Sequence, residues 1–356
     1  MTKVHTLQVT DVTRETADAV SIGFLVPPEL TEEYRYKQGQ YLTLRFHFDG
    51  EDIRRSYSIC SAPHEVGELR VAVKKVKGGR VSTFINENTT LGDMIEVMTP
   101  MGTFTSQMNP TNKKHYVLIA GGSGITPMLS ILKTVLFAEP ESKVTLLYAN
   151  NDEQSVIFRK TIDELAIAYK ESIKVLYVLD KPPSNYPLLL TGIMTVEKLM
   201  GLVENYVGLN LDNEFFICGP TPMMDNAMTV LKKLQIPEER IHIEYFAAPA
   251  TTQEKTEEVL LAQNAHAVIT KDGDEYEVDM LPNETILEAA MRKGLDAPYS
   301  CQSGTCATCR AKLIEGNVHM KTSFALTKHD LEAGFILTCQ ARPLTDTLVV
   351  DYDQAM

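Results

Sequence analysis

The chain has 356 residues, which is more than a single hydrophobic core usually supports, so we expect two or three domains. Its 47 acidic and 34 basic side chains give a formal net charge of -13, which argues against nucleic acid as a partner because phosphates are bound by Lys and Arg. No apolar run approaches the length of a membrane span, and the first residues lack the apolar region of a secretory signal. We therefore expect a cytoplasmic protein that binds neither nucleic acid nor membrane.

The first part of the chain, residues 1–110, consists of short alternating apolar and polar runs separated by Gly and Pro turns. Residues 40–46 and 68–73 are two such runs. Alternation with a period of two, broken by frequent turns, is typical of an antiparallel β-barrel. We predict a small all-β domain here.

Residues 111–247 instead alternate nearly continuous apolar strands with helical stretches, which predicts a doubly wound parallel sheet. Two glycine-containing turns, residues 120–128 and 217–224, follow strands of this sheet, and ligands bind at such carboxyl ends. Glycines let a backbone approach a pyrophosphate, whose charge the N–H groups at a helix start can receive. The first turn is not a G-x-G-x-x-G, however, and close packing alone would also explain its glycines.

Residues 248–261 are small, polar and aperiodic, which is the composition of a linker. The last domain, residues 262–356, opens with a predicted hairpin of strands 267–270 and 275–278, followed by a capped helix over residues 283–294. This domain holds fourteen acidic and eight basic side chains. Such a surface steers basic partners, although the same charge would also serve solubility.

Four of the six cysteines lie in this last domain, spaced C-x4-C-x2-C with a distant fourth. This is the spacing of plant-type 2Fe-2S clusters, and the small residues between the thiols would let N–H groups point at cluster sulfurs. A zinc site or buried structural cysteines are the alternatives, but zinc frameworks usually pair two C-x2-C knuckles, and only one is present. The predicted ligands are Cys301, Cys306, Cys309 and Cys339.

Five motifs occur in a fixed order along the chain: R-x-Y-S, G-x-x-S, G-G-S-G-I-T-P, C-G-P and the cysteine motif. In this order the chain resembles ferredoxin-NADP reductase flavoproteins fused to a plant-type ferredoxin domain, that is, reductase components of bacterial oxygenases. The resemblance covers essentially the whole sequence. It implies a flavin-binding β-barrel (1–110), an NAD(P)-binding α/β domain (111–247), a linker (248–261) and an α+β ferredoxin domain of the β-grasp type (262–356).

The resemblance also assigns a flavin site. It implies that Tyr57 packs on the flavin, that Ser58 bonds near its reactive nitrogen, and that Arg55 meets its pyrophosphate; taken alone, this stretch would be an ordinary exposed strand. Phe246, placed on the other flavin face, would otherwise be a core residue. The full implied flavin set is Arg55, Ser56, Tyr57, Ser58, Val73, Lys75, Gly79, Val81, Ser82 and Phe246.

A nicotinamide dinucleotide is implied at the two glycine-containing turns. Ser58, Cys218 and Glu244 are implied as positioning and polarising groups rather than covalent catalysts, although Cys218 would also suit a buried core position. The implied dinucleotide residues are Gly121, Gly122, Ser123, Gly124, Thr126, Cys218, Gly219 and Pro220.

The implied cofactors are FAD, one 2Fe-2S cluster and NAD(P)H, because NAD(P)H yields two electrons together and the cluster takes one. FMN is the less favoured flavin, since one relative with the same domain order holds it. The resemblance favours NADPH, whereas Asp152 would suit the ribose diol of NADH or would simply cap a helix.

The implied function is electron transfer to an oxygenase component, a diiron hydroxylase or epoxidase. Two alternatives stay open at this point. One is a free-standing NAD(P)H dehydrogenase that reduces quinones or general carriers. The other is a non-catalytic, zinc-bearing nucleotide-binding protein.

Overall fold

A computed structural model describes residues 3–65, 67–208, 213–248 and 260–355. By its internal contacts the chain divides into two compact units. The larger unit comprises His5–Phe46 and Tyr57–Glu244, and the smaller one comprises Met1–Val4, His47–Ser56 and Tyr245–Met356. Within the described ranges, no helix has the length and apolar character needed to cross a bilayer.

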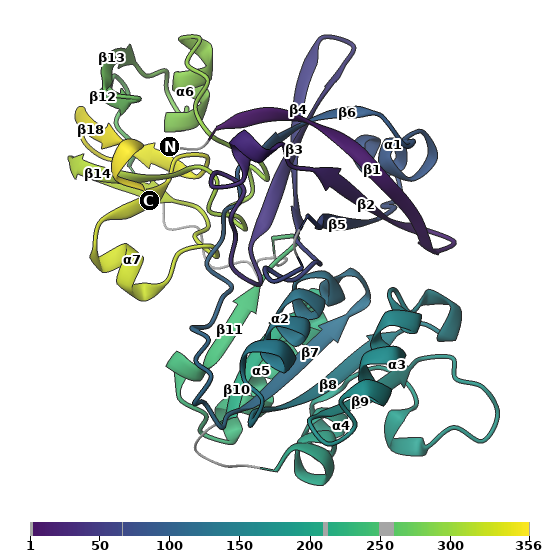
Figure 1. The fold of residues 1–356 in the computed structure, drawn as a ribbon. Coiled ribbons are helices and arrows are strands. Elements are labelled where there is room, and N and C mark those ends of the chain that lie inside the picture. Colours follow the sequence, from purple (N-terminus) through teal and green to yellow (C-terminus); the bar gives the residue numbers. More distant parts are fainter. Residues whose placement is uncertain (1–2, 66, 209–212, 249–259, 356) are drawn as a thin grey trace. The chain divides into compact units, whose positions relative to one another are not determined.

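The first sheet is antiparallel, as the alternating pattern predicted (Figure 1). An isolated bridge pairs Ile59, which directly follows one edge strand, with Val71 inside the other edge strand, so the sheet closes on itself as a barrel. Helix α1, Arg80–Glu87, follows β5. In the order β4-β3-β6-β1-β2-β5, the strands are β1 Val4–Thr16, β2 Ala19–Leu25, β3 Tyr41–Phe48, β4 Glu51–Ser58, β5 Leu69–Lys74 and β6 Met94–Met98.

The second sheet is parallel, in the order β11-β10-β7-β8-β9, which confirms the predicted doubly wound fold. The chain runs outward from β7 to β9 and then returns to β10 on the other side of β7. The strand order therefore reverses between β7 and β10, the point at which open α/β sheets bind ligands. The elements are β7 His115–Gly121, α2 Ile125–Ala138, β8 Lys143–Asn150, α3 Arg159–Ala168, β9 Ile173–Leu179, α4 Val196–Leu202, β10 Asn213–Cys218, α5 Thr221–Lys233 and β11 Ile241–Glu244.

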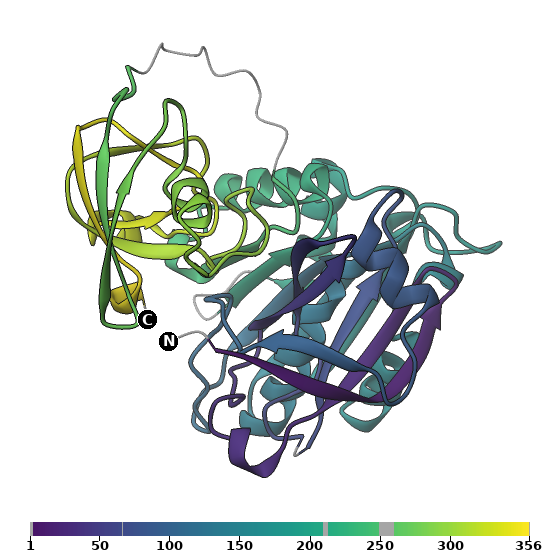
Figure 2. The same cartoon turned by 90° about the horizontal axis from the view of Figure 1, so that it is seen from above.

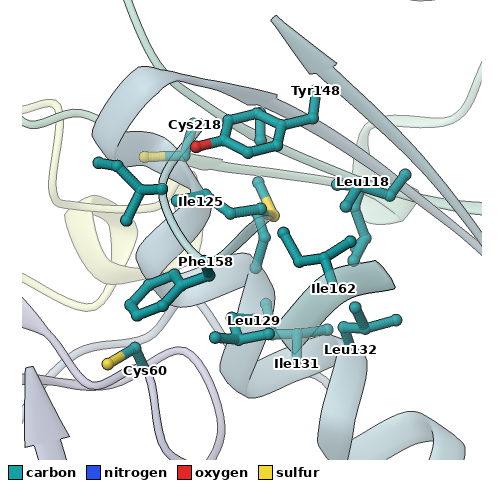
Figure 3. Packing of buried hydrophobic residues seen from close by; sticks show 14 of the residues in the cluster. Cys60, Leu118, Ile125, Leu129, Ile131, Leu132, Tyr148, Phe158, Ile162 and Cys218 are labelled. Carbon is teal, nitrogen blue, oxygen red and sulfur yellow. The ribbon is translucent and has the colours of Figure 1, made fainter. Parts of the chain in front are cut away.

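Helix α2 lies at the centre of the larger unit's core. Figure 3 shows its Ile125, Leu129 and Leu132 in one apolar cluster with Leu118 of β7 and Tyr148 of β8. The helix is apolar on nearly every side, and a helix of this kind is usually buried. Besides the sheet, it contacts the loop after β4. Two contacts fix that loop: the Ser130 hydroxyl donates to the Ser61 carbonyl at 2.7 Å, and Lys133 pairs with Glu65 at 2.8 Å.

The third sheet, coloured green to yellow in Figure 2, is mixed, with β12 parallel to β18 and antiparallel to β13. The predicted hairpin is present, and its turn places Asp272 and Gly273 at positive φ, as a tight two-residue turn requires. In the order β13-β12-β18-β14-β16, the strands are β12 His266–Lys271, β13 Asp274–Asp279, β14 Arg310–Glu315, β16 Phe335–Leu337 and β18 Thr347–Asp351, beside a small sheet of β15 Val318–Met320 and β17 Ala341–Pro343.

The predicted helix before the cysteines is α6, Ile286–Arg292, which begins three residues later than the sequence pattern suggested. Thr285 caps it: its hydroxyl accepts from the Glu288 N–H, and the Glu288 carboxylate accepts in return. Gly294 ends the helix at a φ of 85°. A second helix, α7, spans Lys328–Glu332. Most of the expected linker, residues 249–259, lies outside the described residues.

Candidate functional site

The two glycine-containing turns pack directly against each other at the reversal point of the parallel sheet. Ala120 and Cys218 face each other in register, so the turns leave neighbouring strands side by side. A Cβ on Gly124 would lie 2.1 Å from the Cys218 carbonyl oxygen, and one on Gly121 would lie 2.5 Å from Cδ of Pro220. Close packing, one of the two explanations considered for these glycines, therefore accounts for both.

Gly122 differs from its neighbours, because its φ is 52° and a Cβ there would meet nothing within 4 Å. Its carbonyl accepts a 2.9 Å hydrogen bond from the Tyr148 hydroxyl, and the Thr126 hydroxyl holds the Ser123 carbonyl at 3.0 Å. Helix α2 begins immediately afterwards, capped by Gly124 without a side-chain hydrogen bond. The turn thus presents open backbone at a helix N-terminus, which suits a phosphate. Tyr148 lies outside the sequence motif, which therefore gave no sign of its contribution.

Ser58, Cys218 and Glu244 come together although they are far apart in the sequence. The Ser58 hydroxyl, at the end of β4, donates to the Glu244 carboxylate at 2.9 Å. Glu244, at the end of β11, is the register partner of Cys218 at the end of β10. A hydroxyl, a thiol and a carboxylate therefore lie together at the carboxyl ends of β10 and β11. Strand β4 of the antiparallel sheet ends at the same place.

Burial dominates the proton chemistry of this group. It raises the pKa of Glu244 to about 7, although the hydrogen bond from Ser58 acts in the opposite direction. Burial also raises the pKa of the Cys218 thiol well above its ordinary value, and the charge of Glu244 adds to this. Cys218 is therefore a protonated thiol at neutral pH, as a positioning group would be, and no reactive thiolate forms here.

The predicted flavin residues of β4 become less exposed toward the end of the strand. Arg55 is exposed, Ser56 and Tyr57 are partly buried, and Ser58 is buried. An exposed guanidinium beside a half-buried aromatic ring suits a ligand that combines a phosphate with a flat ring system.

A second part of the predicted flavin set lies at the start of α1. Gly79 is the N-cap of that helix and makes no side-chain capping bond, and the positive end of a helix dipole at this place suits a phosphate. The Ser82 hydroxyl donates to the Gly79 carbonyl at 3.3 Å and accepts from the Val76 N–H at 3.1 Å, which fixes the turn. Val81 is buried in the barrel.

The remaining flavin candidates are placed less favourably. The Val73 side chain is fully buried, and its carbonyl accepts from Asn86. Lys75 forms an ion pair with Glu87 at 3.0 Å. Phe246 is 45% exposed, so it is not a core residue.

The four predicted ligand cysteines form two pairs. Cys301 and Cys306 shift each other's pKa in opposite directions, and so do Cys309 and Cys339, so the two members of each pair are close neighbours. Two pairs are what a two-iron cluster requires, with two thiolates for each iron. Over the described residues, no group of three or more His, Cys, Asp or Glu side chains is arranged to hold a single metal ion.

The loop between the thiols is held in a shape that directs backbone toward sulfur. The N–H groups of Ser303 and Cys306 point at the Cys301 sulfur at 3.4 and 3.3 Å. Gly304 has a φ of 76°, and a Cβ there would lie 2.3 Å from the Thr322 hydroxyl oxygen. The Gln340 amide donates to the Gln302 carbonyl at 2.9 Å. These residues fit a 2Fe-2S cluster, and the supporting roles of Thr322 and Gln340 were missed in the sequence because they lie outside the motif.

Within each pair one thiol gives up its proton more readily. The neighbouring Cys306 thiol lowers the pKa of Cys301, and the neighbouring Cys309 thiol lowers the pKa of Cys339. Each partner thiol shows the opposite shift. Opposite shifts of this kind are what two neighbouring thiols show when the charge of one disfavours the charge of the other.

Two hollows lie elsewhere on the described surface. One, of about 380 Å³, is beside the cysteine loop and is lined by Cys339, Gln302, Lys321 and Arg342 among others. The other, of about 560 Å³, lies at the amino-terminal ends of the parallel strands and is rich in lysine. It is at the opposite edge of that sheet from the glycine-containing turns, so it is not part of the dinucleotide site.

Asp152 adopts the capping role that was one of its two alternatives. It is the N-cap of a short helical turn, Glu153–Ser155, and accepts from the Ser155 N–H at 2.9 Å. Its other carboxylate oxygen accepts from the Asn151 amide. Asp152 therefore provides no argument for NADH over NADPH.

Three family descriptions match consecutive parts of the chain. "Oxidoreductase FAD-binding domain" matches residues 6–106, "Oxidoreductase NAD-binding domain" matches residues 118–229, and "2Fe-2S iron-sulfur cluster binding domain" matches residues 269–344. The flavin is therefore FAD, beside NAD(P)H and a 2Fe-2S cluster.

Curated relatives match over nearly the full length. The chain is 43% identical over 354 residues to one subunit of the 1,2-phenylacetyl-CoA epoxidase of Escherichia coli (strain K12), covering 99% of both chains. It is 36% identical to the ferredoxin reductase component of 3-ketosteroid-9-alpha-monooxygenase of Rhodococcus rhodochrous, covering 97% of this chain and 96% of that one. The glycine betaine monooxygenase reductase subunit of Chromohalobacter salexigens is 27% identical, with 95% and 93% covered.

Solved structures with low sequence identity share the fold. Phthalate dioxygenase reductase aligns with a TM-score of 0.60 at 24% identity, covering 98% of both chains. A type IV self-sufficient cytochrome P450 monooxygenase aligns with a TM-score of 0.70 at 23% identity, covering 98% of this chain and 41% of that one. The chain belongs to the ferredoxin-NADP reductase-like flavoproteins that serve as reductase components of oxygenases, and it transfers electrons from NAD(P)H through FAD and a 2Fe-2S cluster.

Proposed function

We propose that this chain is the reductase component of an epoxidase of the phenylacetyl-CoA type, whose oxygenase component is a diiron protein. The observation that carries the proposal is the 43% identity to one subunit of such an epoxidase, which extends over 99% of both chains. The ferredoxin reductase components of ketosteroid monooxygenases match less closely, at 36%. We also propose a cytoplasmic location, where NAD(P)H is supplied and thiols stay reduced.

FAD would be held by β4 and the start of α1. Tyr57 packs on the ring system, Arg55 neutralises the pyrophosphate, and the N–H groups after Gly79 receive the phosphate charge. When bound, FAD accepts a hydride from NAD(P)H and releases its two electrons singly to the cluster.

The coenzyme would lie with its pyrophosphate at the turn from Gly121 to Thr126 and its nicotinamide beside Cys218, Gly219 and Pro220. The Ser58 hydroxyl is hydrogen-bonded to the Glu244 carboxylate, which orients it. The two groups can therefore polarise the reacting ring without forming a covalent bond to it. The neutral Cys218 thiol fills space beside the nicotinamide and helps exclude water.

Electrons leave the chain at the cysteine loop. The hollow beside Cys339 brings solvent, and hence a partner's surface, close to one ligand of the cluster. The excess of acidic side chains in residues 262–356 would attract a basic docking surface on the oxygenase component.

Reconstitution tests the proposal. The purified chain is combined with the remaining components of a phenylacetyl-CoA epoxidase and, separately, with those of a ketosteroid monooxygenase. We expect NADH or NADPH oxidation to be coupled to epoxide formation only in the first mixture. Comparing the two coenzymes in that assay decides which one the chain prefers.

The matched control is Cys306→Ser, which keeps the flavin residues and removes one cluster ligand. It should oxidise NAD(P)H with ferricyanide but form no epoxide. If the unmodified chain reduces quinones at the same rate whether or not an oxygenase is present, and forms no product, the free-standing dehydrogenase is the better account.

A further inference from the structure

Arg54 is a buried charge that none of the recognised motifs explains. It lies in β4 beside the exposed Arg55, yet its own side chain is only 3% exposed. Its guanidinium contacts the carboxylates of Asp52 at 2.8 Å and Asp296 at 2.5 Å. Asp52 is on the same strand, whereas Asp296 comes from the segment just before the cysteine loop, and all three residues belong to the smaller unit.

The contacts around Arg54 involve a whole segment rather than one residue. The guanidinium lies over the Tyr299 ring, 4.3 Å from its centroid, and the Tyr299 hydroxyl donates to the Asp52 carbonyl at 3.4 Å. Two residues further along β4, the hydroxyl of Ser56 lies 2.8 Å from the hydroxyl of Ser300. Residues 296–300 are therefore fastened along residues 52–56 by charge, ring stacking and a hydroxyl pair.

The ion pairs of Arg54 contribute more to the orientation of the two segments than to the stability of the fold. Burial works against the positive charge, but the hydrogen bonds to Asp52 and Asp296 outweigh it and leave the pKa of Arg54 raised. A buried ion pair contributes little net stability compared with apolar packing of the same volume, because desolvation offsets the attraction. What the planar, forked guanidinium provides is a fixed orientation of the groups that it joins.

The two joined segments lead directly into the two redox sites. Residue 300 precedes Cys301, the first predicted cluster ligand, and residue 56 precedes Tyr57 and Ser58, which are assigned to the flavin. We propose that Arg54 is a positioning residue that fixes the start of the cysteine loop to the flavin-binding strand and thereby sets the rate of electron transfer from flavin to cluster. This inference rests on the flavin and cluster assignments of the proposed function.

The step involved is the transfer of single electrons from the reduced flavin to the cluster, and the proton that the reduced flavin holds is released to solvent as the flavin is reoxidised. NAD(P)H reduces the flavin by two electrons, and each transfer then oxidises the flavin by one electron and reduces the cluster by one. The cluster must pass the first electron to its acceptor before it receives the second. Because such a transfer depends on the separation and orientation of the two centres, loosening the attachment should slow this step alone.

The experiment uses the full chain with both cofactors bound. The variants are Asp296→Ala, Asp296→Glu and Arg54→Met. The control is Asp279→Ala, which removes another exposed carboxylate ion pair of the same domain, the one with His266, 95% exposed at the carboxylate. Anaerobic rapid mixing with NAD(P)H follows flavin reduction by absorbance, and freeze-quenched samples follow cluster reduction by electron paramagnetic resonance.

We expect Asp296→Ala to slow cluster reduction by about tenfold or more while flavin reduction stays within about twofold, because misplacement of reacting groups by ~1 Å has large rate effects. Asp296→Glu, which keeps the carboxylate, should restore most of the rate, and Asp279→Ala should leave it unchanged. Asp296 is 62% exposed, so its variants are expected to fold even if Arg54→Met does not. The reduction potential of the cluster should be unchanged in all of them.

The positioning role is overturned if cluster reduction in Asp296→Ala keeps the unmodified rate. It is also overturned if flavin reduction, cofactor content or the cluster potential falls in parallel with that rate, which is what a merely structural role would produce. Failure of the proposed function looks different: the unmodified chain would then lack flavin or cluster, and the positioning role would fall with it.

Discussion

Glu244 shows how one partly buried side chain links the chemistry of the site to pH. Its carboxyl sits at the end of β11, bonded to Ser58, and burial raises its pKa to about 7. Near neutral pH it is therefore present in both protonation states, unlike an ordinary surface glutamate. A group of this kind can adjust its proton as charge changes on a neighbouring ring.

The raised pKa predicts a pH-dependent cost to folding. Below the ordinary value of 4.5 the carboxyl is protonated in both states and costs nothing. As pH rises, the unfolded chain ionises first, so the folded state loses stability until the full cost is reached above about pH 7. Glu244→Gln should therefore stabilise the flavin-free chain by roughly 2 kcal/mol more at pH 8 than at pH 5. Thermal unfolding at the two pH values measures this, with Glu239→Gln, an exposed neighbour, as the control.

Equal effects of Glu244→Gln on stability at pH 5 and pH 8 would contradict a raised pKa of the Glu244 carboxyl. The same variant should also flatten any inflection near pH 7 in the rate of flavin reduction by NAD(P)H.

The Ser58 hydroxyl predicts a rate effect without a binding effect. Ser58→Ala removes the donor to Glu244 and should slow flavin reduction by about a hundredfold, as loss of one polarising group does. FAD content should be retained, because Arg55 and Tyr57 are untouched. Ser58→Thr, which keeps a hydroxyl, should recover part of the rate. Anaerobic stopped-flow absorbance separates the two quantities, and an unchanged rate in Ser58→Ala would remove Ser58 from the polarising group.

At the residue scale the sequence indicated which side chains could take part in the site, but not which of them are buried or what they contact. The motif drew attention to Arg55, whereas the adjacent Arg54, which is buried and paired with Asp296, belongs to no motif. Its partner lies 242 residues away, so no local pattern connects them. Tyr148 and Gln340 escaped notice for the same reason.

At the scale of elements, the two glycine-containing turns explain why a dinucleotide site can form where it does. The turns after β7 and β10 begin in register, and Gly124 sits where any side chain would strike the Cys218 carbonyl. Strand positions were predictable because the apolar runs are long and uninterrupted. The start of α6 was not, because Thr285, rather than an earlier polar residue, supplies the capping box.

Gly124→Ala should test the packing of the two turns. The added Cβ would require a backbone shift, since it would lie 2.1 Å from a carbonyl oxygen. We expect a loss of about 2 kcal/mol of stability, typical of overpacking, and a raised KM for NAD(P)H. Gly201→Ala, in helix α4 where the nearest contact is the end of the Leu189 side chain, is the control and should be neutral or stabilising. A Gly124→Ala chain with unchanged stability and KM would show that the turns do not need their close approach.

At the scale of the whole molecule, three sheets of different topology supply three cofactor functions in chain order. The pattern of apolar and polar residues predicted these sheets, because each class of sheet has its own hydrophobic pattern. The hydrophobic pattern did not predict that Ser130 and Lys133 of α2 hold the loop after β4, so that most of the first sheet and the whole second sheet lie in one compact unit. Such contacts depend on side chains that are unremarkable in sequence.

The order of electron flow predicts a selective loss in Cys306→Ser. Removing one member of the Cys301 pair should abolish reduction of one-electron protein acceptors such as cytochrome c, because the cluster no longer forms. Reduction of ferricyanide through the flavin should persist. Cys60→Ser, a buried thiol outside the cluster, is the matched control and should keep both activities. Loss of both activities in Cys306→Ser with FAD still bound would reverse the proposed order.

The central claim is that one chain carries electrons from NAD(P)H through FAD to a 2Fe-2S cluster. Its most direct test is an anaerobic titration of the unmodified chain with NAD(P)H, followed by visible absorbance and low-temperature electron paramagnetic resonance. The account predicts that the flavin bleaches and that a signal of a reduced 2Fe-2S cluster appears in the same titration. A flavin that bleaches while the cluster stays oxidised, or a chain that contains zinc and no flavin, would contradict it.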